Sequence, residues 1–345
     1  MIGIWTVIAA VIGFGVTAIL GKWFIPFLRK VKFGQTIREE GPKWHAKKDG
    51  TPTMGGIMFI IGIAVSLAVC LTAFYITQAN SSSLGIAETT LMMVKVIGGF
   101  LMAVAFGAIG FIDDYIKVVK KRNLGLTAWQ KLILQFVVAG AYLLSIFLAG
   151  GSSETFLPFV GFVDLGIAYW ILAAILIVGM VNAVNFTDGI DGLNGSVTFF
   201  VCIFFMLIAS FLSMGGMSIL AVAAAGGCMG FLLWNFNPAK VFMGDTGSLF
   251  LGGMVCALAF GTNLPILLFP LGIIYIAEIL SVVLQVTYFK LTHGKRLFKM
   301  SPIHHHFEMC GWGEMKICIV FSRVTILMGI GCVFLVLYGV VPYYG

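Results

Sequence analysis

Long apolar runs separated by short polar segments make up nearly the whole chain. A helix needs about 20 mostly apolar residues to cross the hydrocarbon core of a bilayer, and most of the runs are about that long. We therefore predict an all-α polytopic integral membrane protein, with about ten transmembrane helices in a single domain over residues 1–345. The first run is too long for the core of a signal peptide and is expected to be a retained span. The expected spans lie at about 3–28, 53–76, 92–112, 129–149, 166–184, 196–214, 217–235, 248–262, 264–289 and 317–340.

Composition supports a lipid environment. Hydrophobic residues make up 60% of the chain and charged residues only 10%, whereas soluble domains carry roughly 25% charged residues. This excludes a soluble enzyme, a disordered protein and a small disulfide scaffold. The seven cysteines show no C-x-x-C spacing, so neither a disulfide framework nor a zinc site is expected.

The distribution of lysine and arginine predicts the orientation of the chain. Segments 77–91 and 150–165 contain no lysine or arginine, whereas four other connecting segments contain them. Because positively charged loops stay in the cytoplasm, ten spans place both termini on the outer side of the membrane. The net charge of +7 is then explained by orientation, and no nucleic-acid partner is expected. The segments that contain lysine or arginine are 29–52, 113–128, 236–247 and 290–316.

The same orientation gathers acidic groups and histidines at the cytoplasmic face. A membrane scaffold has no reason to collect its titratable side chains on one side. The pattern therefore predicts an active site in a cleft at the cytoplasmic membrane surface. The residues concerned are Asp113, Asp114, Asp188, Asp191, Asp245 and all five histidines.

An adjacent pair of aspartates ends the third apolar run. Successive residues on a helix point about 100° apart, so Asp113 and Asp114 face different directions. One carboxylate can then face a metal or substrate while the other orients a neighbouring group. The alternative is a solvated helix end, although an acidic residue at a helix C-terminus opposes the helix dipole.

A run rich in asparagine, aspartate and glycine follows the fifth span. Asn185, Asp188 and Asp191 recur every three residues, which predicts that they lie on one side of a helical or 3₁₀ turn. The intervening glycines allow the backbone to approach a ligand closely. The alternative is a polar surface turn.

Asp245 lies between glycines just before the eighth span. Thr246 or Ser248 is expected to cap that span, and the helix N-terminus favours a bound phosphate. The alternative is that Asp245 is itself only a cap. Together the acidic segments offer carboxylate and amide oxygens, which suit Mg²⁺ or Mn²⁺ rather than zinc. With lysines on the same face, they indicate phosphoryl chemistry on a nucleotide or membrane-bound substrate.

Two further polar segments carry candidate substrate ligands. Residues 301–308 contain His304, His305 and His306 in succession. Three adjacent histidines cannot easily converge on one ion, so we expect phosphate or carboxylate contacts and proton transfer, with a solvated loop as the alternative. The segment from Lys47 to Gly56 combines lysines, hydroxyls and glycines before a helix, which is typical either of an anion site or of an ordinary basic loop.

These segments together resemble the phospho-N-acetylmuramoyl-pentapeptide transferase family, a branch of the polyprenyl-phosphate N-acetylhexosamine-1-phosphate transferase superfamily. The aspartate pair and the central Asn/Asp segment resemble the wider superfamily, while 51–56 and 302–308 resemble the muramoyl-pentapeptide branch. The resemblance covers nearly the whole chain in order, without departure at the matched positions. The matched segments are 48–56, 113–114, 185–193, 235–248 and 301–308.

The resemblance implies a phosphoglycosyl transferase in a bacterial cytoplasmic membrane. Undecaprenyl phosphate would attack the β-phosphate of UDP-N-acetylmuramoyl-pentapeptide, releasing UMP and leaving lipid I in the membrane for peptidoglycan synthesis. Mg²⁺ is the expected cofactor, a groove between helices would hold the prenyl tail, and a homodimer is a family expectation. The resemblance leaves open whether transfer occurs in one step or through a covalent phosphoryl-enzyme.

The resemblance also implies residue roles. Asp245 would hold Mg²⁺, and Asp113 would position or deprotonate the lipid phosphate. The expected catalytic residues are Asp113, Asp114, Asp245 and His304. The expected substrate-binding residues are Lys48, Thr53, Lys117, Lys121, Asn185, Asp188, Gly189, Asp191, Asn235, Phe242, His305 and His306. Among these, Gly189, Asp191, Asn235 and Phe242 would contact the uridine moiety, with the Phe242 ring stacked on the base.

Charged residues inside the late spans keep one alternative open. Glu278 lies within the ninth expected span and Arg323 near the start of the tenth, and such charges are costly in a bilayer. Arg323 is expected to extend to the cytoplasmic side, and Glu278 to face a polar interior. A transporter that uses Glu278 is therefore one rival, a sister enzyme acting on UDP-N-acetylglucosamine is another, and a membrane scaffold is a third. Pro265 and Pro270 predict a kink in the ninth run.

Overall fold

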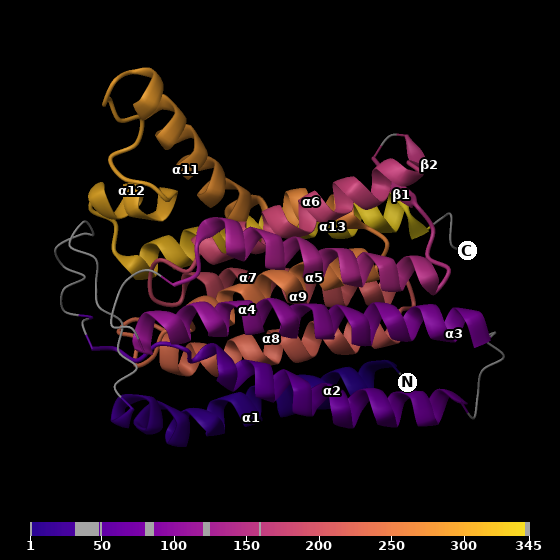
Figure 1. Ribbon diagram of the computed structural model, residues 1–345. Helices are drawn as coiled ribbons and strands as arrows, with labels where there is room; N and C mark the ends of the chain where they lie inside the picture. The colour runs from indigo at the N-terminus through magenta and orange to yellow at the C-terminus, as the bar shows by residue number, and fades with distance from the viewer. Residues whose placement is uncertain are drawn as a thin grey trace.

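A computed structural model describes residues 2–31, 48, 50–79, 86–119, 125–158 and 160–341. Within these residues, ten helical segments are long and apolar enough to cross a membrane (Figure 1), and this confirms the all-α polytopic prediction. Their helices are α1 (Ile2–Lys30), α2 (Gly56–Ala79), α3 (Ile86–Met93) continued by η2 (Val94–Gly98) and α4 (Gly99–Val119), α5 (Ala128–Leu148), α6 (Ile167–Phe186), α7 (Leu193–Phe211), α8 (Gly215–Asn235), α9 (Gly244–Gly261), α11 (Ile273–Leu291) and α13 (Glu314–Gly339).

Two spans differ most from the predicted boundaries, and the eighth begins at Gly244 rather than near residue 248, so Asp245 lies in the first turn of α9 and not before it. The ninth begins at Ile273 rather than near residue 264, because Pro265–Leu267 forms the 3₁₀ helix η3 and Leu268–Leu271 the short helix α10. Proline lacks the N–H that a continuous helix needs, so the apolar run is interrupted there. The third span is longer than predicted because α3, η2 and α4 follow one another without a break. Its π-helical segment η2 contains the buried Lys95, whose Nζ donates to Asn263 Oδ1 at 2.6 Å.

Helices α8 and α9 form the centre of the bundle. α1, α2 and α7 pack against α8, while α4 and α6 pack against α9. Small residues allow these close approaches: a Cβ at Gly226 would collide with the α1 backbone at Ala10, and one at Gly252 with the α6 backbone at Val181. The most buried helices are therefore those that carry Asn235 at the end of α8 and Asp245 at the start of α9.

The two ends of the bundle carry different structures (Figure 1). A short antiparallel hairpin, β1 (Glu154–Leu157) and β2 (Gly161–Asp164), pairs Glu154 with Asp164 and lies at the end where both termini are found. Hydropathy did not predict this hairpin. The short helix α12 (Ile303–Met309) lies at the opposite end, beside α11, which leans away from the other helices.

Candidate active site

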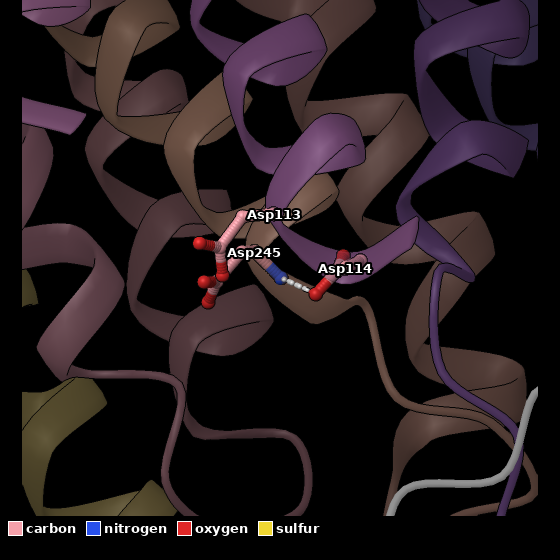
Figure 2. A group of neighbouring side chains, drawn as sticks. All are labelled: Asp113, Asp114 and Asp245. Carbon is pink, nitrogen blue, oxygen red and sulfur yellow. Dashed lines mark hydrogen bonds between the residues drawn. The ribbon is translucent and has the colours of Figure 1, made fainter. Parts of the chain in front are cut away.

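Three aspartates meet between the last third of α4 and the first turn of α9. One carboxylate oxygen from each of Asp113, Asp114 and Asp245 lies within 4.8 Å of the others. The close crossing of the helices requires Gly110, because a Cβ there would collide with the backbone carbonyl of Asp245. Figure 2 shows the carboxylates of Asp113 and Asp245 side by side. The carboxylate of Asp114 instead contacts the backbone N–H of Asp245.

Asp114 caps α9 from the neighbouring helix. Its Oδ1 accepts from the Asp245 N–H at 3.2 Å, and its Oδ2 accepts from the Thr246 N–H at 2.9 Å and from Thr246 Oγ1 at 2.8 Å. The prediction that Thr246 or Ser248 caps this span is therefore wrong, since Ser248 Oγ instead donates to the Gly244 carbonyl at 3.1 Å. These amides are occupied by a protein carboxylate, so the predicted phosphate cradle at this N-terminus is not supported.

Asp113 and Asp245 share a lysine. Lys117, one turn after Asp113 on α4, places its Nζ 2.6 Å from Asp113 Oδ2 and 3.0 Å from Asp245 Oδ2. The other oxygen of Asp113 accepts from the Leu126 N–H at 2.8 Å. The two aspartates predicted from the helix geometry to diverge do so: Asp113 faces a lysine and Asp245, and Asp114 orients a helix end.

Lys131 on α5 completes the cluster. Its Nζ lies 3.0 Å from Asp245 Oδ2. The sequence analysis missed this residue because it falls inside the fourth apolar run. A charged residue within a predicted span is itself a signal of function, and it would have found Lys131. We call Asp113, Asp245, Lys117 and Lys131 the aspartate–lysine cluster.

Asn185 ties α6 to this cluster. Its Nδ2 donates to Asp245 Oδ1 at 3.0 Å and to Ser248 Oγ at 2.7 Å. The carboxylate of Asp245 is thus held by two ammonium groups and one amide. Such contacts fix its orientation before any ligand arrives, which a metal or phosphate site requires.

Asp188 has a different environment. Burial raises the pKa of its carboxyl well above the ordinary value, and the nearby Asp245, Asp114 and Asp191 raise it further. Its side chain is half-buried and lies close to three other carboxyl groups. A carboxylate in this position is costly unless a cation approaches it.

The donor set fits a hard divalent cation. Four carboxyl groups gather here, those of Asp113, Asp114, Asp188 and Asp245, and among the described residues Lys117 and Lys131 contact them, through Asp113 and Asp245. Carboxyl groups therefore outnumber ammonium groups, and every candidate ligand atom is oxygen, as Mg²⁺ and Mn²⁺ prefer. Asp245 and Asp113 are the candidate ligands because each contacts a lysine ammonium group that a cation can replace, whereas both oxygens of Asp114 accept from backbone N–H groups of α9.

A second lysine joins two carboxylates on the other side of the Asn/Asp segment. Lys48 Nζ lies 2.7 Å from Asp191 Oδ1 and 2.7 Å from Glu314 Oε2. The same Glu314 oxygen accepts from the Asp191 N–H at 2.9 Å, and Asp191 Oδ2 accepts from the Ala239 N–H at 3.0 Å. We call Lys48, Asp191 and Glu314 the Lys48 network.

Sequence analysis also missed Glu314. It opens α13, where a negative charge is favourable next to the helix dipole, and the sequence alone shows no more than that. The prediction that Asn185, Asp188 and Asp191 share one side is wrong: Asn185 faces Asp245 and Asp191 faces Lys48. The three-residue spacing fails because α6 ends at Phe186 and the chain then turns, with Gly192 at a φ of 78°.

Backbone pairing joins the first loop to the segment after α8. The N–H of Phe242 donates to the Pro52 carbonyl and its carbonyl accepts from Gly55, both at 2.8 Å. The ring of Phe242 is half-buried, whereas Thr53 is buried. Asn235 is buried and spans the same region, because its Oδ1 accepts from the Gly192 N–H at 3.1 Å and its Nδ2 donates to the Val241 carbonyl at 2.9 Å.

The three adjacent histidines face three different partners. His304 is fully buried, with its Nδ1 3.0 Å from Glu278 Oε2 and its ring against Gly189. His305 Nδ1 lies 2.6 Å from Glu308 Oε2. His306 Nδ1 accepts from the Lys299 N–H at 3.2 Å. Lys121, the remaining candidate, lies outside the described residues.

Comparison with known proteins relates the chain to one group of enzymes. Residues 96–263 match the model of glycosyl transferase family 4, and residues 48–60 match phospho-N-acetylmuramoyl-pentapeptide-transferase signature 1. The phospho-N-acetylmuramoyl-pentapeptide-transferase of Heliobacterium modesticaldum is 47% identical over 322 residues, which are 92% of this chain and 94% of that protein. Those of Bacillus mycoides and Caldicellulosiruptor bescii are 45% and 46% identical, over 94% and 95% of this chain and 95% and 96% of their own lengths.

Proposed function

The chain belongs to the phospho-N-acetylmuramoyl-pentapeptide-transferase family, and on this premise we propose a Mg²⁺-dependent reaction at the aspartate–lysine cluster. Phospho-N-acetylmuramoyl-pentapeptide passes from its UDP nucleotide to undecaprenyl phosphate, giving lipid I and UMP for peptidoglycan synthesis. The observation that carries the proposal is the excess of carboxylates over lysines around Asp245. A diphosphate substrate and a divalent cation complement that arrangement.

The reaction exchanges one phosphorus–oxygen bond for another. An oxygen of undecaprenyl phosphate attacks the β-phosphorus of the nucleotide, and UMP leaves with the electron pair of the broken bond. Catalysis of such a transfer rests mainly on positioning and on stabilising negative charge. The bound Mg²⁺ supplies Lewis acidity to the diphosphate.

Protein side chains supply the rest of the site. Asp245 and Asp113 hold the cation, and Asp113 orients the attacking phosphate. Lys117 and Lys131, which contact Asp245 at 3.0 Å each, neutralise the phosphate oxygens as negative charge moves toward UMP. Asp114 keeps α9, and with it Asp245, in place. The lipid phosphate is mostly ionised at neutral pH, so its positioning contributes more than its deprotonation.

The nucleotide binds on the side of the Lys48 network. The half-buried ring of Phe242 stacks on the uracil base, and Lys48 contacts the nucleotide or its sugar–peptide. Asp191 and Asn235 support that surface through their contacts with Lys48, Ala239 and Gly192. His305 and His306 lie farther along α12 and contact the sugar–peptide.

The prenyl tail lies along α11. Leu280, Val283 and Leu284 on this helix are exposed apolar residues, which suits contact with lipid. The positive-inside distribution of lysine and arginine supports a cytoplasmic site and outer termini, and both termini lie at the end opposite α12 (Figure 1). We include a homodimer in the proposal on family resemblance alone.

Release of UMP tests the proposal. The purified protein in detergent receives UDP-N-acetylmuramoyl-pentapeptide, undecaprenyl phosphate and Mg²⁺, with a chelator and UDP-N-acetylglucosamine as parallel controls. Mg²⁺-dependent UMP release with the muramoyl-pentapeptide nucleotide alone is the expected result. Release with UDP-N-acetylglucosamine would assign the sister activity. Absence of release in folded, lipid-supplied protein would contradict the proposal.

A further inference from the structure

A buried acid–histidine pair lies outside the aspartate–lysine cluster. Glu278 in α11 and His304 in α12 both have fully buried side chains, and His304 Nδ1 lies 3.0 Å from Glu278 Oε2. The same carboxylate oxygen accepts from the backbone N–H of His304 at 3.4 Å. An acidic residue inside a membrane span is costly, so a carboxylate at this position calls for a function.

The far side of the His304 ring meets the Asn/Asp segment. A Cβ added at Gly189 would collide with His304 Nε2, so the ring is in close contact with the backbone next to Asp188. Within the described residues, Nδ1 and Nε2 of His304 and Oε1 of Glu278 have no hydrogen-bond partner, so the 3.0 Å approach of Nδ1 to Glu278 Oε2 is an ion-pair contact. The ring therefore lies between a carboxylate of α11 and the turn at residues 187–192.

We propose that Glu278 is a positioning residue that holds the His304 ring against Gly189 and thereby fixes the turn carrying Asp188 and Asp191. The inference rests on the proposed function, because that turn borders both the aspartate–lysine cluster and the nucleotide side. His304 is fully buried, so in this arrangement it acts through the turn rather than on substrate. This replaces the catalytic role that the sequence suggested for His304.

The chemistry of the pair explains why a carboxylate serves here better than an apolar side chain. One oxygen faces both the ring nitrogen and the backbone N–H of His304, which sets the position of α12 and the orientation of the ring together. Because neighbouring apolar residues of α11 are exposed, the pair links an exposed apolar helix face to the turn at residues 187–192.

The variant Glu278→Gln tests this role with little change of shape. We measure the Kd for UDP-N-acetylmuramoyl-pentapeptide without undecaprenyl phosphate, so that no turnover occurs, and then kcat and both KM values. Loss of a residue that orients a ligand-contacting group typically lowers affinity or activity roughly tenfold or more. We expect nucleotide affinity to fall about tenfold, with the KM for undecaprenyl phosphate unchanged. Ser281→Ala is the matched control, since Ser281 is buried one turn later on α11 and its Oγ donates to the Glu278 carbonyl.

A double-mutant cycle separates positioning from a general loss of stability. In a His304→Ala background, Glu278→Gln should reduce nucleotide affinity no further, because the two residues act as one unit. It should also raise the thermal midpoint of that background, because His304→Ala alone leaves a buried carboxylate without its partner. Additive losses of affinity would overturn the proposal. So would a lower thermal midpoint for Glu278→Gln with unchanged nucleotide affinity, or a rise confined to the KM for the lipid.

Gly189→Ala perturbs the His304 ring from the side opposite Glu278. It tests the proposal even where Glu278→Gln fails to fold. The new methyl group should displace the ring and weaken nucleotide binding, and the loss should vanish in the His304→Ala background, where the collision is gone. A loss that persists in that background would mean that Gly189 contacts the nucleotide directly, and would overturn this account of the ring. Wild-type UMP release, measured in parallel, tests the proposed function separately.

Discussion

Two lysine-bridged carboxylate pairs lie at one end of this bundle, and they differ in the amides and carboxyl groups that surround them. Lys117 joins Asp113 to Asp245 at 2.6 and 3.0 Å, and Lys48 joins Asp191 to Glu314 at 2.7 Å each. In the Lys48 network, backbone amides of Asp191 and Ala239 satisfy the carboxylates. Around Asp245, by contrast, two further carboxylates lie close enough to perturb one another.

The difference separates a site for chemistry from a support for binding. In the Lys48 network, one lysine and two backbone N–H groups donate to the two carboxylates, and these contacts hold three segments of chain together. Around Asp245, the additional carboxyl groups of Asp114 and Asp188 crowd the site, and a cation or a ligand that brings one would relieve that crowding. The same residue types therefore act differently because the surrounding acids and amides differ.

The largest expected effect comes from Asp245→Asn. The change keeps the shape of the side chain and removes the charge that Lys117 and Lys131 share. UMP release in saturating Mg²⁺ should fall on the order of a thousandfold, a magnitude typical of losing a preorganised electrostatic contact. Asp164→Asn in the hairpin, at the other end of the bundle, is the control. Near-normal Mg²⁺-dependent turnover of Asp245→Asn would show that the cluster is not the reaction site.

The adjacent aspartates offer a sharper comparison. Asp114→Asn should lower both turnover and the thermal midpoint, because an amide NH₂ cannot accept from the Thr246 N–H and hydroxyl. An unsatisfied buried donor costs about 1–3 kcal/mol. Asp113→Asn should lower turnover with little change in the midpoint. Thermal unfolding in the same detergent compares the two, and equal midpoints would remove the distinction between the capping and reacting carboxylates.

A smaller and more specific effect is expected in the Lys48 network. Glu314→Gln removes one of the two negative charges that pair with Lys48, and it weakens the contact that holds the Asp191 backbone N–H. The KM for the nucleotide should rise about tenfold while kcat changes little, since an interaction equal in ground and transition states changes KM alone. Steady-state UMP release at saturating lipid gives both constants. A fall in kcat with unchanged KM would place Glu314 with the reacting groups instead.

The smallest effect is a gain in stability. The pKa of Asp188 is raised in the folded protein, so stability falls as the pH rises from the ordinary pKa of the carboxyl to the raised one, and the loss is complete above the raised pKa. Asp188→Asn should therefore raise the thermal midpoint at neutral pH without divalent cation. The gain should shrink as the pH falls through the raised pKa toward the ordinary one. A gain independent of pH would contradict this cause.

Sequence patterning gave the membrane architecture because the bilayer imposes it on every span. A bilayer demands apolar runs of a set length, and all ten runs became spans. The boundary near Pro265 was wrong because a short helix precedes α11, and the β1–β2 hairpin was missed because it is only four residues per strand. Such local features depend on backbone pairing and not on hydropathy.

The sequence allowed the acidic residues of the site to be predicted, but not the residues that pair with them. Asp113, Asp114 and Asp245 stand out by position in the chain, and the structure brings them together. Lys131 and Glu314 could not be assigned partners, because Lys131 meets Asp245 over 114 residues of chain and Glu314 meets Lys48 over 266. Those pairings follow from which helices pack side by side, and a single sequence does not specify this.

The most direct test of the account is to locate a bound divalent cation. Mn²⁺ can stand in for Mg²⁺ at an all-oxygen site, and its anomalous scattering marks its position in crystals of the protein grown with UDP-N-acetylmuramoyl-pentapeptide. The account predicts a peak within about 2.3 Å of an Asp245 carboxylate oxygen, absent from crystals of Asp245→Asn. A peak beside Asp191 and Glu314, or one that persists in Asp245→Asn, would contradict the claim that the aspartate–lysine cluster is the reaction centre.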